Sequence, residues 1–189
     1  YWFFIRVIED LEVKYNIIDN INDFDVGGKI ILPGVGSFDS FINSLKKKGL
    51  EEKIIELVIH KKVPILGICV GMQSLFNKSE EGNQKGLSLI KGACKKFQLK
   101  FNKVPHIGWN KVNIIKSNLL FEGVENNYFY FANSYYVSVS DKNLIISYTN
   151  YDYDFVSAIN FNNIYGVQFH PEKSYKQGKQ IIKNFIYKC

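Results

Sequence analysis

The segment Pro64-Ile65-Leu66-Gly67-Ile68-Cys69-Val70-Gly71-Met72-Gln73 decides the fold that we expect for this chain. Its first part belongs to an almost wholly apolar run over residues 63–68, which predicts a strand buried on both faces of a parallel sheet. The strand runs directly into Cys69, with Gly67 and Gly71 two positions to either side. We expect an amphipathic helix to follow, so that the cysteine stands on a sharp strand-to-helix turn.

This turn has the pattern of a nucleophile elbow, in which small neighbouring residues let the backbone approach a substrate. The start of a helix also places free backbone N–H groups beside the sulfur, which favours thiolate over thiol. Cys69 is therefore a candidate nucleophile, although a lone cysteine at a strand end is more often a small buried hydrophobic residue. Cys94 and Cys189 lack this context, and we interpret both as structural.

The rest of the first half alternates short apolar runs with amphipathic stretches. Residues 15–19 and 29–32 are predicted strands, and apolar residues at helical spacing predict a helix over residues 50–61. This order of strands and helices favours a parallel sheet covered by helices.

The second half consists mainly of strand-like runs separated by turn residues, which predicts antiparallel strands added to the sheet. These strands are expected at 128–131, 135–139, 144–148, 155–161 and 164–169, with a hairpin turn at Asn162-Asn163 and a last amphipathic helix at 180–187. The sequence therefore predicts an α/β fold, with a mostly parallel sheet flanked by helices and an antiparallel extension in the second half.

Length and composition limit the classes of protein. The 189 residues suffice for one sizeable core, so we expect a single domain over residues 1–189. The net charge of +6 permits nucleic-acid contacts, but the lysines form no long basic run, so no nucleic-acid partner is predicted. Three widely spaced cysteines suit neither a disulfide framework nor a metal site, so we predict that the protein is located in the reducing cytoplasm. No apolar run approaches the roughly 18 to 20 residues of a membrane span, so no membrane contact is predicted.

A cysteine nucleophile needs an imidazole base and a group that orients it. Of the three histidines, His170 stands at a predicted strand end, and Pro171 makes the turn rigid enough for Glu172 to face the imidazole. His60 lies at the polar end of a predicted helix, and His106 has no carboxylate within several residues. His170 with Glu172 is therefore the candidate pair, although such a turn alone could be a surface loop.

Attack on an amide carbonyl also needs donors for the developing oxyanion. The loop Pro33-Gly34-Val35-Gly36 follows a predicted strand, and its glycines can turn backbone N–H groups toward that oxygen. The backbone N–H of Val70 is the second candidate donor. A plain strand-to-helix turn remains the alternative interpretation of the loop.

Together these segments resemble the class I glutamine amidotransferases, and in particular the glutaminase subunit of imidazole glycerol phosphate synthase. The resemblance is carried by Gly67 to Gln73, Leu32-Pro33-Gly34-Val35-Gly36-Ser37-Phe38, Val104-Pro105-His106-Ile107-Gly108-Trp109-Asn110 and Gly166-Val167-Gln168-Phe169-His170-Pro171-Glu172-Lys173-Ser174. It implies a flavodoxin-like fold, L-glutamine as substrate, no metal or cofactor, and a (βα)8-barrel cyclase as partner in a heterodimer that serves histidine biosynthesis.

The resemblance also implies roles for particular residues. Cys69, His170 and Glu172 would form a catalytic triad. The oxyanion and the substrate would be held by Gly34, Val35, Gly36, Val70, Gly71, Gln73, Ser134 and Tyr135. The cyclase would be contacted by Trp109, Tyr130 and Lys173.

The chain departs from the family pattern in two places. Residues 1–11 look like the helix that follows the family's first strand and its loop, so we expect the domain to lack that strand and to fold poorly without it. Asn133 stands where the family commonly has histidine, which suggests a paralogue that supplies ammonia to a sugar amidotransferase of surface polysaccharide synthesis. A catalytically silent subunit that only docks on a barrel enzyme is a further alternative.

Overall fold

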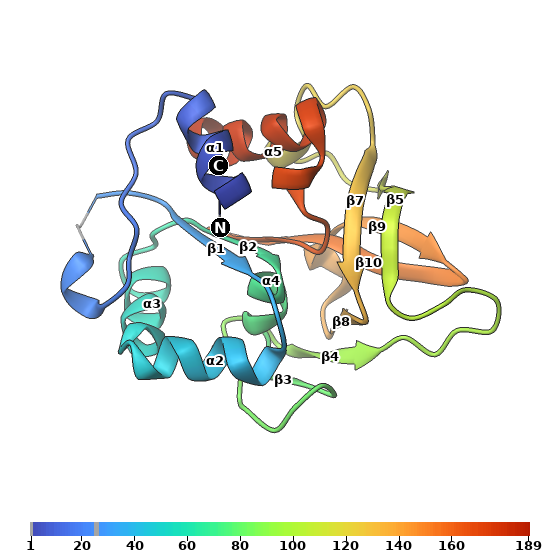
Figure 1. Cartoon of the computed structure of the whole chain (residues 1–189), viewed down its shortest axis with the longest axis horizontal. Coiled ribbons are helices and arrows are strands. Elements are labelled where there is room, and N and C mark those ends of the chain that lie inside the picture. Colours follow the sequence, from blue (N-terminus) through green and yellow to red (C-terminus); the bar gives the residue numbers. More distant parts are fainter. Residues whose placement is uncertain (1, 25–26) are drawn as a thin grey trace.

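A mixed sheet forms the centre of the computed structural model, which describes residues 2–24 and 27–189 (Figure 1). Neighbouring strands follow the order β1-β2-β11-β10-β8-β4-β3, with β9 paired to β10 and β6 to β9. The strands of this sheet are β1 (Ile30–Gly34), β2 (Ile65–Cys69), β3 (Lys78–Ser79), β4 (Gly92–Lys96), β6 (Asn113–Ile114), β8 (Tyr135–Val139), β9 (Ile145–Tyr151), β10 (Tyr153–Phe161) and β11 (Ile164–Val167). A separate ribbon pairs β5 (His106–Lys111) with β7 (Tyr128–Asn133) in antiparallel fashion.

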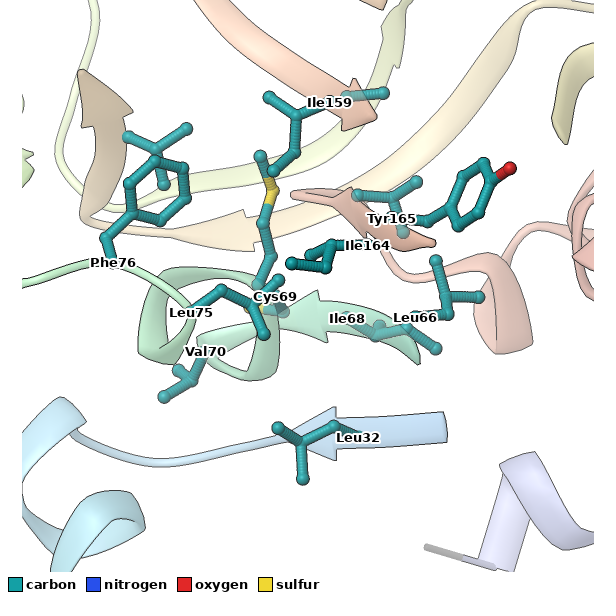
Figure 2. Close-up of a cluster of buried hydrophobic side chains, with 14 of the residues drawn as sticks. Leu32, Leu66, Ile68, Cys69, Val70, Leu75, Phe76, Ile159, Ile164 and Tyr165 are labelled. Carbon is teal, nitrogen blue, oxygen red and sulfur yellow. The ribbon is translucent and has the colours of Figure 1, made fainter. Parts of the chain in front are cut away.

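The parallel part of the sheet is β1, β2 and β11, and β2 lies between the other two. All five residues of β2 are buried, as expected for a strand covered on both faces. Figure 2 shows Leu66 and Ile68 of β2 between Leu32 of β1 and Ile164 of β11. The antiparallel part begins where β10 pairs with β11.

Helices cover the sheet on both sides. Helices α1 and α5 lie on one side of β1 and β2, and α2 and α3 lie on the other (Figure 1). The α-helices are α1 (Trp2–Asp10), α2 (Phe38–Lys47), α3 (Leu50–Ile59), α4 (Val70–Ser74) and α5 (Tyr175–Lys188), and the 3-10 helices are η1 (Ile21–Asp23), η2 (Leu119–Phe121), η3 (Lys142–Leu144) and η4 (Pro171–Lys173). Ser37 caps α2 by accepting from the backbone N–H of Ser40. Among the helices that the structure describes, none is both long and apolar enough to cross a bilayer.

Most predicted elements are present, with shifted ends. The predicted strands 29–32 and 63–68 correspond to β1 and β2, and the predicted helix 50–61 corresponds to α3. The five strands predicted in the second half correspond to β7, β8, β9, β10 and β11, and the last helix is α5. The predicted hairpin turn joins β10 to β11. The α/β fold with an antiparallel extension is therefore confirmed.

Two predictions of local structure are wrong. Residues 15–19 form no strand, because none of the strands in the described ranges runs beside them and a strand needs a neighbour for its backbone hydrogen bonds. The helix after Cys69 is not amphipathic: α4 has five residues, and all are buried. It is a short, buried turn of helix that packs on β1 and β2.

The N-terminal helix predicted over residues 1–11 corresponds to α1, although Tyr1 itself lies outside the described residues. Among the described strands, β1 lies at one end of the sheet order. The absence of a first strand and its effect on folding stay predictions, as does the single domain.

Candidate active site

Cys69 is the last residue of β2 and directly precedes α4. Its backbone has φ 54° and ψ −114°, a conformation that residues with side chains rarely adopt. Such strain persists only where the surrounding structure enforces it, and it concentrates at functional sites. The side chain is buried, so the turn presents one sulfur inside the protein rather than on its surface.

Three glycines make this turn possible because each is packed against backbone. A Cβ at Gly71 would overlap the carbonyl oxygen of Leu32, and a Cβ at Gly34 would overlap the backbone nitrogen of Gly71. A Cβ at Gly67 would lie 2.7 Å from the carbonyl oxygen of Gly71. The β1 loop and the elbow therefore approach each other as closely as backbones can.

We expect Gly71→Ala to lower the free energy of unfolding by about 1 to 3 kcal/mol, because the added methyl group must push β1 away from α4. Urea unfolding followed by circular dichroism measures the loss. Gly27→Ala is the matched control, since a Cβ at Gly27 meets nothing within 4 Å. Equal stability of the two variants would show that the close approach is not required.

His170 and Glu172 form a short, buried pair at η4. The Nδ1 atom of His170 lies 2.7 Å from Oε1 of Glu172. The backbone of His170 is held from two sides: its N–H donates to the carbonyl of Tyr130, and its carbonyl accepts from the hydroxyl of Ser174. Pro171 opens the 3-10 turn between the two side chains, as its fixed φ allows.

The imidazole of His170 faces the sulfur of Cys69, and the two side chains act on each other electrostatically. Burial lowers the pKa of His170, but hydrogen bonds to Cys69 and Glu172 and their charges raise it, to about 9 in total. The histidine therefore stays protonated at neutral pH beside the sulfur. The structure thus brings together Cys69, His170 and Glu172.

Replacement of Cys69 by alanine should lower the pKa of His170, because the largest effect that raises it is the bond to this sulfur. The sign follows from the charge: without its partner, the buried imidazolium loses its proton at a lower pH. Titration of the ring resonances by NMR measures this shift. A midpoint that stays near that of the wild-type protein would mean that the sulfur and the ring do not interact.

Two buried glutamines connect the cysteine to β8. Gln168 donates from Nε2 to the sulfur of Cys69 at 3.7 Å, and its Oε1 accepts from Nε2 of Gln73 at 3.0 Å. Nε2 of Gln73 also donates to the carbonyl of Tyr135 at 3.0 Å. The sequence predicted Gln73 as a site residue but not Gln168. The position of Gln168 could have indicated a role, because it is polar, directly follows a buried strand and stands two positions before His170.

Of the predicted substrate residues, Ser134 directly precedes β8 and Tyr135 is its first residue, whose carbonyl accepts from Gln73. Burial and the charges of Glu81 and Glu80 raise the pKa of Tyr135. Glu81, which also accepts from the backbone N–H of Phe38, was not predicted as a site residue. Nothing in its local sequence distinguishes it from a solvated charge, because only the fold brings it near β8.

Asn133 is buried beside His106, its partner in the β5–β7 register. Its Nδ2 donates to the carbonyl of Tyr135 at 2.9 Å, the same oxygen that Gln73 uses. Burial lowers the pKa of His106 to about 4 although its bond to Asn133 raises it. His106 is therefore a neutral ring, stacked on Phe131 and Tyr151.

The predicted oxyanion loop lies at the end of β1, where Gly34 pairs in register with Cys69. Val35 is exposed and Gly36 has φ 88°, which only glycine adopts without strain. Val70 is the first residue of α4, so its N–H has no partner within the helix. A pocket beside this loop is lined by Phe3, Phe4, Pro33, Gly34, Val35, Ile68, His170, Glu172 and Lys173.

The three residues predicted to face a partner gather on one surface next to this pocket. Lys173 Nζ lies 5.7 Å from the ring centroid of Tyr130, and the Trp109 ring lies edge-on to that of Tyr130 at 6.1 Å. Tyr175, which was not predicted, stacks on Trp109 at 5.2 Å and is 79% exposed. An aromatic and cationic surface thus adjoins the candidate site.

The remaining histidine and cysteines lie in other environments. His60 is exposed at the end of α3. Burial raises the pKa of Cys94 to about 12, so this thiol stays protonated. Burial also raises the pKa of Cys189. Neither cysteine carries the structural features that surround Cys69.

Fold and site together define a glutamine amidotransferase of class I. The family model "Glutamine amidotransferase class-I" matches residues 4–189. A crystal structure of a glutamine amidotransferase has a TM-score of 0.76 at 13% identity and covers 97% of this chain and 90% of its own. The glutaminase domain of CTPS from Trypanosoma brucei has a TM-score of 0.64 at 16% identity, with 98% and 87% covered. At these identities the structures support the fold alone.

Sequence relatives narrow the assignment. Imidazole glycerol phosphate synthase subunit HisH of Leptospira borgpetersenii is 46% identical, over 96% of this chain and 92% of the relative. Subunit HisH 2 of Methanococcus maripaludis is 52% identical over 84% and 79%, and subunit HisH of Methanocaldococcus jannaschii is 48% identical over 96% and 91%. The chain belongs to this HisH family of class I glutamine amidotransferases.

Proposed function

We propose that this chain is the glutaminase subunit of an imidazole glycerol phosphate synthase, which hydrolyses L-glutamine to glutamate and ammonia at Cys69. The ammonia passes to a (βα)8-barrel cyclase partner that makes imidazole glycerol phosphate in histidine biosynthesis. The observation that carries the proposal is the buried sulfur on a strained elbow, bonded to a histidine that Glu172 orients at 2.7 Å. Membership of the HisH family supports the cyclase as the acceptor of the ammonia.

The first half of the reaction forms a thioester. The Cys69 thiolate attacks the side-chain carbonyl carbon of glutamine, and the carbonyl oxygen takes the charge. Backbone N–H groups of Val70 and of the loop 34–36 stabilise this oxyanion. The protonated His170 gives its proton to the leaving nitrogen, so that ammonia departs when the carbon–nitrogen bond breaks.

The second half releases glutamate. The now neutral His170 takes a proton from water, and the resulting hydroxide attacks the thioester carbon. Collapse of this intermediate breaks the carbon–sulfur bond and restores the thiolate beside the imidazolium. Glu172 holds the ring in one orientation through both halves and stabilises its positive charge.

The amino-acid end of glutamine is bound toward β8, where Ser134 and Tyr135 supply polar groups. The Nε2 atom of Gln73 donates to Tyr135 and Gln168, so its Oε1 atom is free to accept a hydrogen bond from the substrate. Glu81, whose charge reaches Tyr135, suits the positive α-ammonium group. Hydrogen bonds at both ends would place the amide carbon at the sulfur.

The surface of Trp109, Tyr130 and Lys173 contacts the barrel. The exposed ring of Trp109 and a cation over the half-buried ring of Tyr130 are features of protein interfaces, where aromatic anchors carry much of the binding energy. Lys173 follows the proposed triad glutamate directly, so the interface and the reaction centre share one short turn. We also place the protein in the cytoplasm, with its partner.

Labelling with a glutamine-mimicking electrophile tests this function against a catalytically silent subunit. We expect 6-diazo-5-oxo-L-norleucine to modify Cys69 at one equivalent per chain, in competition with L-glutamine, in the presence of the barrel partner. Peptide mass spectrometry locates the adduct. An unlabelled Cys69 would support the silent subunit and overturn the proposal.

The acceptor is tested separately. The gene should restore histidine-independent growth to a strain that lacks its own glutaminase subunit, when expressed with its cognate cyclase. Labelling of Cys69 without such rescue would favour the alternative in which a sugar amidotransferase receives the ammonia.

A further inference from the structure

Gln168 is a buried polar residue for which the proposed reaction has so far needed no role. It directly follows β11 and stands two positions before His170. Its side chain is fully buried, and its backbone N–H donates to the carbonyl of Ser157 at 2.9 Å. An amide in such a place costs stability unless its polar atoms are bonded, so its partners indicate its purpose.

The hydrogen bonds leave one orientation for both glutamine side chains. The Tyr135 carbonyl can only accept, so Gln73 must turn its nitrogen toward it, at 3.0 Å. The second N–H of that nitrogen then points to Gln168, which must offer its oxygen, at 3.0 Å. The Nε2 atom of Gln168 is thereby left facing the sulfur of Cys69, at 3.7 Å. A backbone carbonyl thus determines, through two amides, that the sulfur meets a donor.

We propose that Gln168, whose amide is oriented by Gln73, is a positioning residue that holds the Cys69 sulfur as a thiolate in attacking position. The proposal rests on the proposed function, since it concerns the same nucleophile. A donor to the charged form of an acid favours that form, and bonds to ions are the stronger ones. The sulfur would then have two donors, the imidazolium of His170 directly before η4 and the neutral amide of Gln168 directly after β11.

The neutral amide differs from the imidazolium in one respect that matters for the reaction. His170 gives up its proton when ammonia leaves, and its attraction for the sulfur falls at that moment. Gln168 does not titrate, so it remains a donor in every protonation state of the histidine. It can therefore bind the thiolate before attack and again when the carbon–sulfur bond breaks in the second half of the reaction.

The test measures the pH dependence of Cys69 alkylation by iodoacetamide in the complex with the barrel partner. The titratable and charged groups at this site are His170, directly before η4, and Glu172 and Lys173 of η4, and Tyr135 lies beyond Gln73 on β8. All are left unchanged by the substitutions. Gln168→Met keeps the length of the side chain without its polar atoms, and Gln168→Asn withdraws the amide by one methylene.

We expect both variants to raise the alkylation midpoint by about one pH unit, so that alkylation below the midpoint slows about tenfold. Gln168→Met should lower kcat for glutamine hydrolysis more than it raises KM, because the Tyr135 carbonyl still orients Gln73. Ser157→Ala is the matched control: its hydroxyl is fully buried and bonded to Ser147 at 2.9 Å, and its loss leaves the sulfur contact intact. Its alkylation midpoint should stay at that of the wild-type protein.

A midpoint unchanged in a folded Gln168 variant overturns the role of Gln168, even when glutamine turnover in the wild-type complex is normal. Absence of turnover in the wild-type complex overturns the proposed function instead, whatever the midpoint does. If neither variant folds, the wild-type protein decides the matter by NMR. The side-chain amide resonance of Gln168 must shift with pH at the midpoint of Cys69 alkylation, and a resonance that does not shift rejects the proposal.

Discussion

Replacing Cys69 with alanine should abolish glutamine hydrolysis while the fold survives. Without the sulfur no thioester can form, and removal of a catalytic nucleophile lowers kcat by about 10⁴-fold or more. The fold should persist because alanine removes one buried atom and adds none at a turn packed against glycines. Glutamate release in the complex with the barrel partner measures the loss, and circular dichroism checks the fold.

Cys189→Ala is the control for loss of a thiol elsewhere in the chain. Cys189 lies at the end of α5, where its carbonyl accepts from Lys29. This variant should keep wild-type turnover. Glutaminase activity that survives in the Cys69→Ala protein would remove the thioester mechanism, and with it the assigned role of the elbow.

Replacing Glu172 with glutamine should lower kcat by about 10² to 10⁴-fold and change KM little. The shape is unchanged, but the charge that stabilises the imidazolium of His170 is lost. The pKa of His170, raised in part by Glu172, should fall accordingly. At neutral pH less imidazolium is then available to protonate the departing nitrogen, which slows the first half of the reaction.

Steady-state kinetics over a range of pH separate these effects. The midpoint assigned to His170 should move to lower pH in Glu172→Gln, in the same direction as its pKa. Glu122→Gln is the control, since Glu122 forms a surface ion pair with Lys188 at 2.9 Å and surface pairs contribute little. A kcat equal to that of the wild-type protein in Glu172→Gln would exclude the carboxylate from the mechanism.

Local patterns predicted the elements near the site because the burial of β2 on both faces is visible in the apolar character of its consecutive residues. A wholly apolar run indicates a strand buried on both faces, and the glycines around Cys69 indicate a turn that tolerates no side chains. Residues 15–19 carried an equally strand-like pattern and form no strand. The two segments differ in whether a partner strand lies beside them. A strand needs a second strand for its backbone hydrogen bonds, and the pattern within one segment does not show whether the fold supplies it.

The length and character of α4 show the same limit. The sequence after Cys69 predicted an amphipathic helix, whereas the structure has five buried residues. Burial on every side depends on what β1, β11 and α2 place around this turn. Those contacts come from distant parts of the chain.

The sequence by itself determined which residues can carry chemistry here: a cysteine between glycines, and a histidine made rigid by a proline with a carboxylate two positions on. These patterns are readable because they act through the geometry of a few adjacent peptide units. Only the tertiary structure decided that β11 lies next to β2, which brings His170 and Gln168 to the sulfur. It also decided which way the two buried amides face, because their orientation is imposed by a carbonyl on β8 that no local pattern could connect to Cys69.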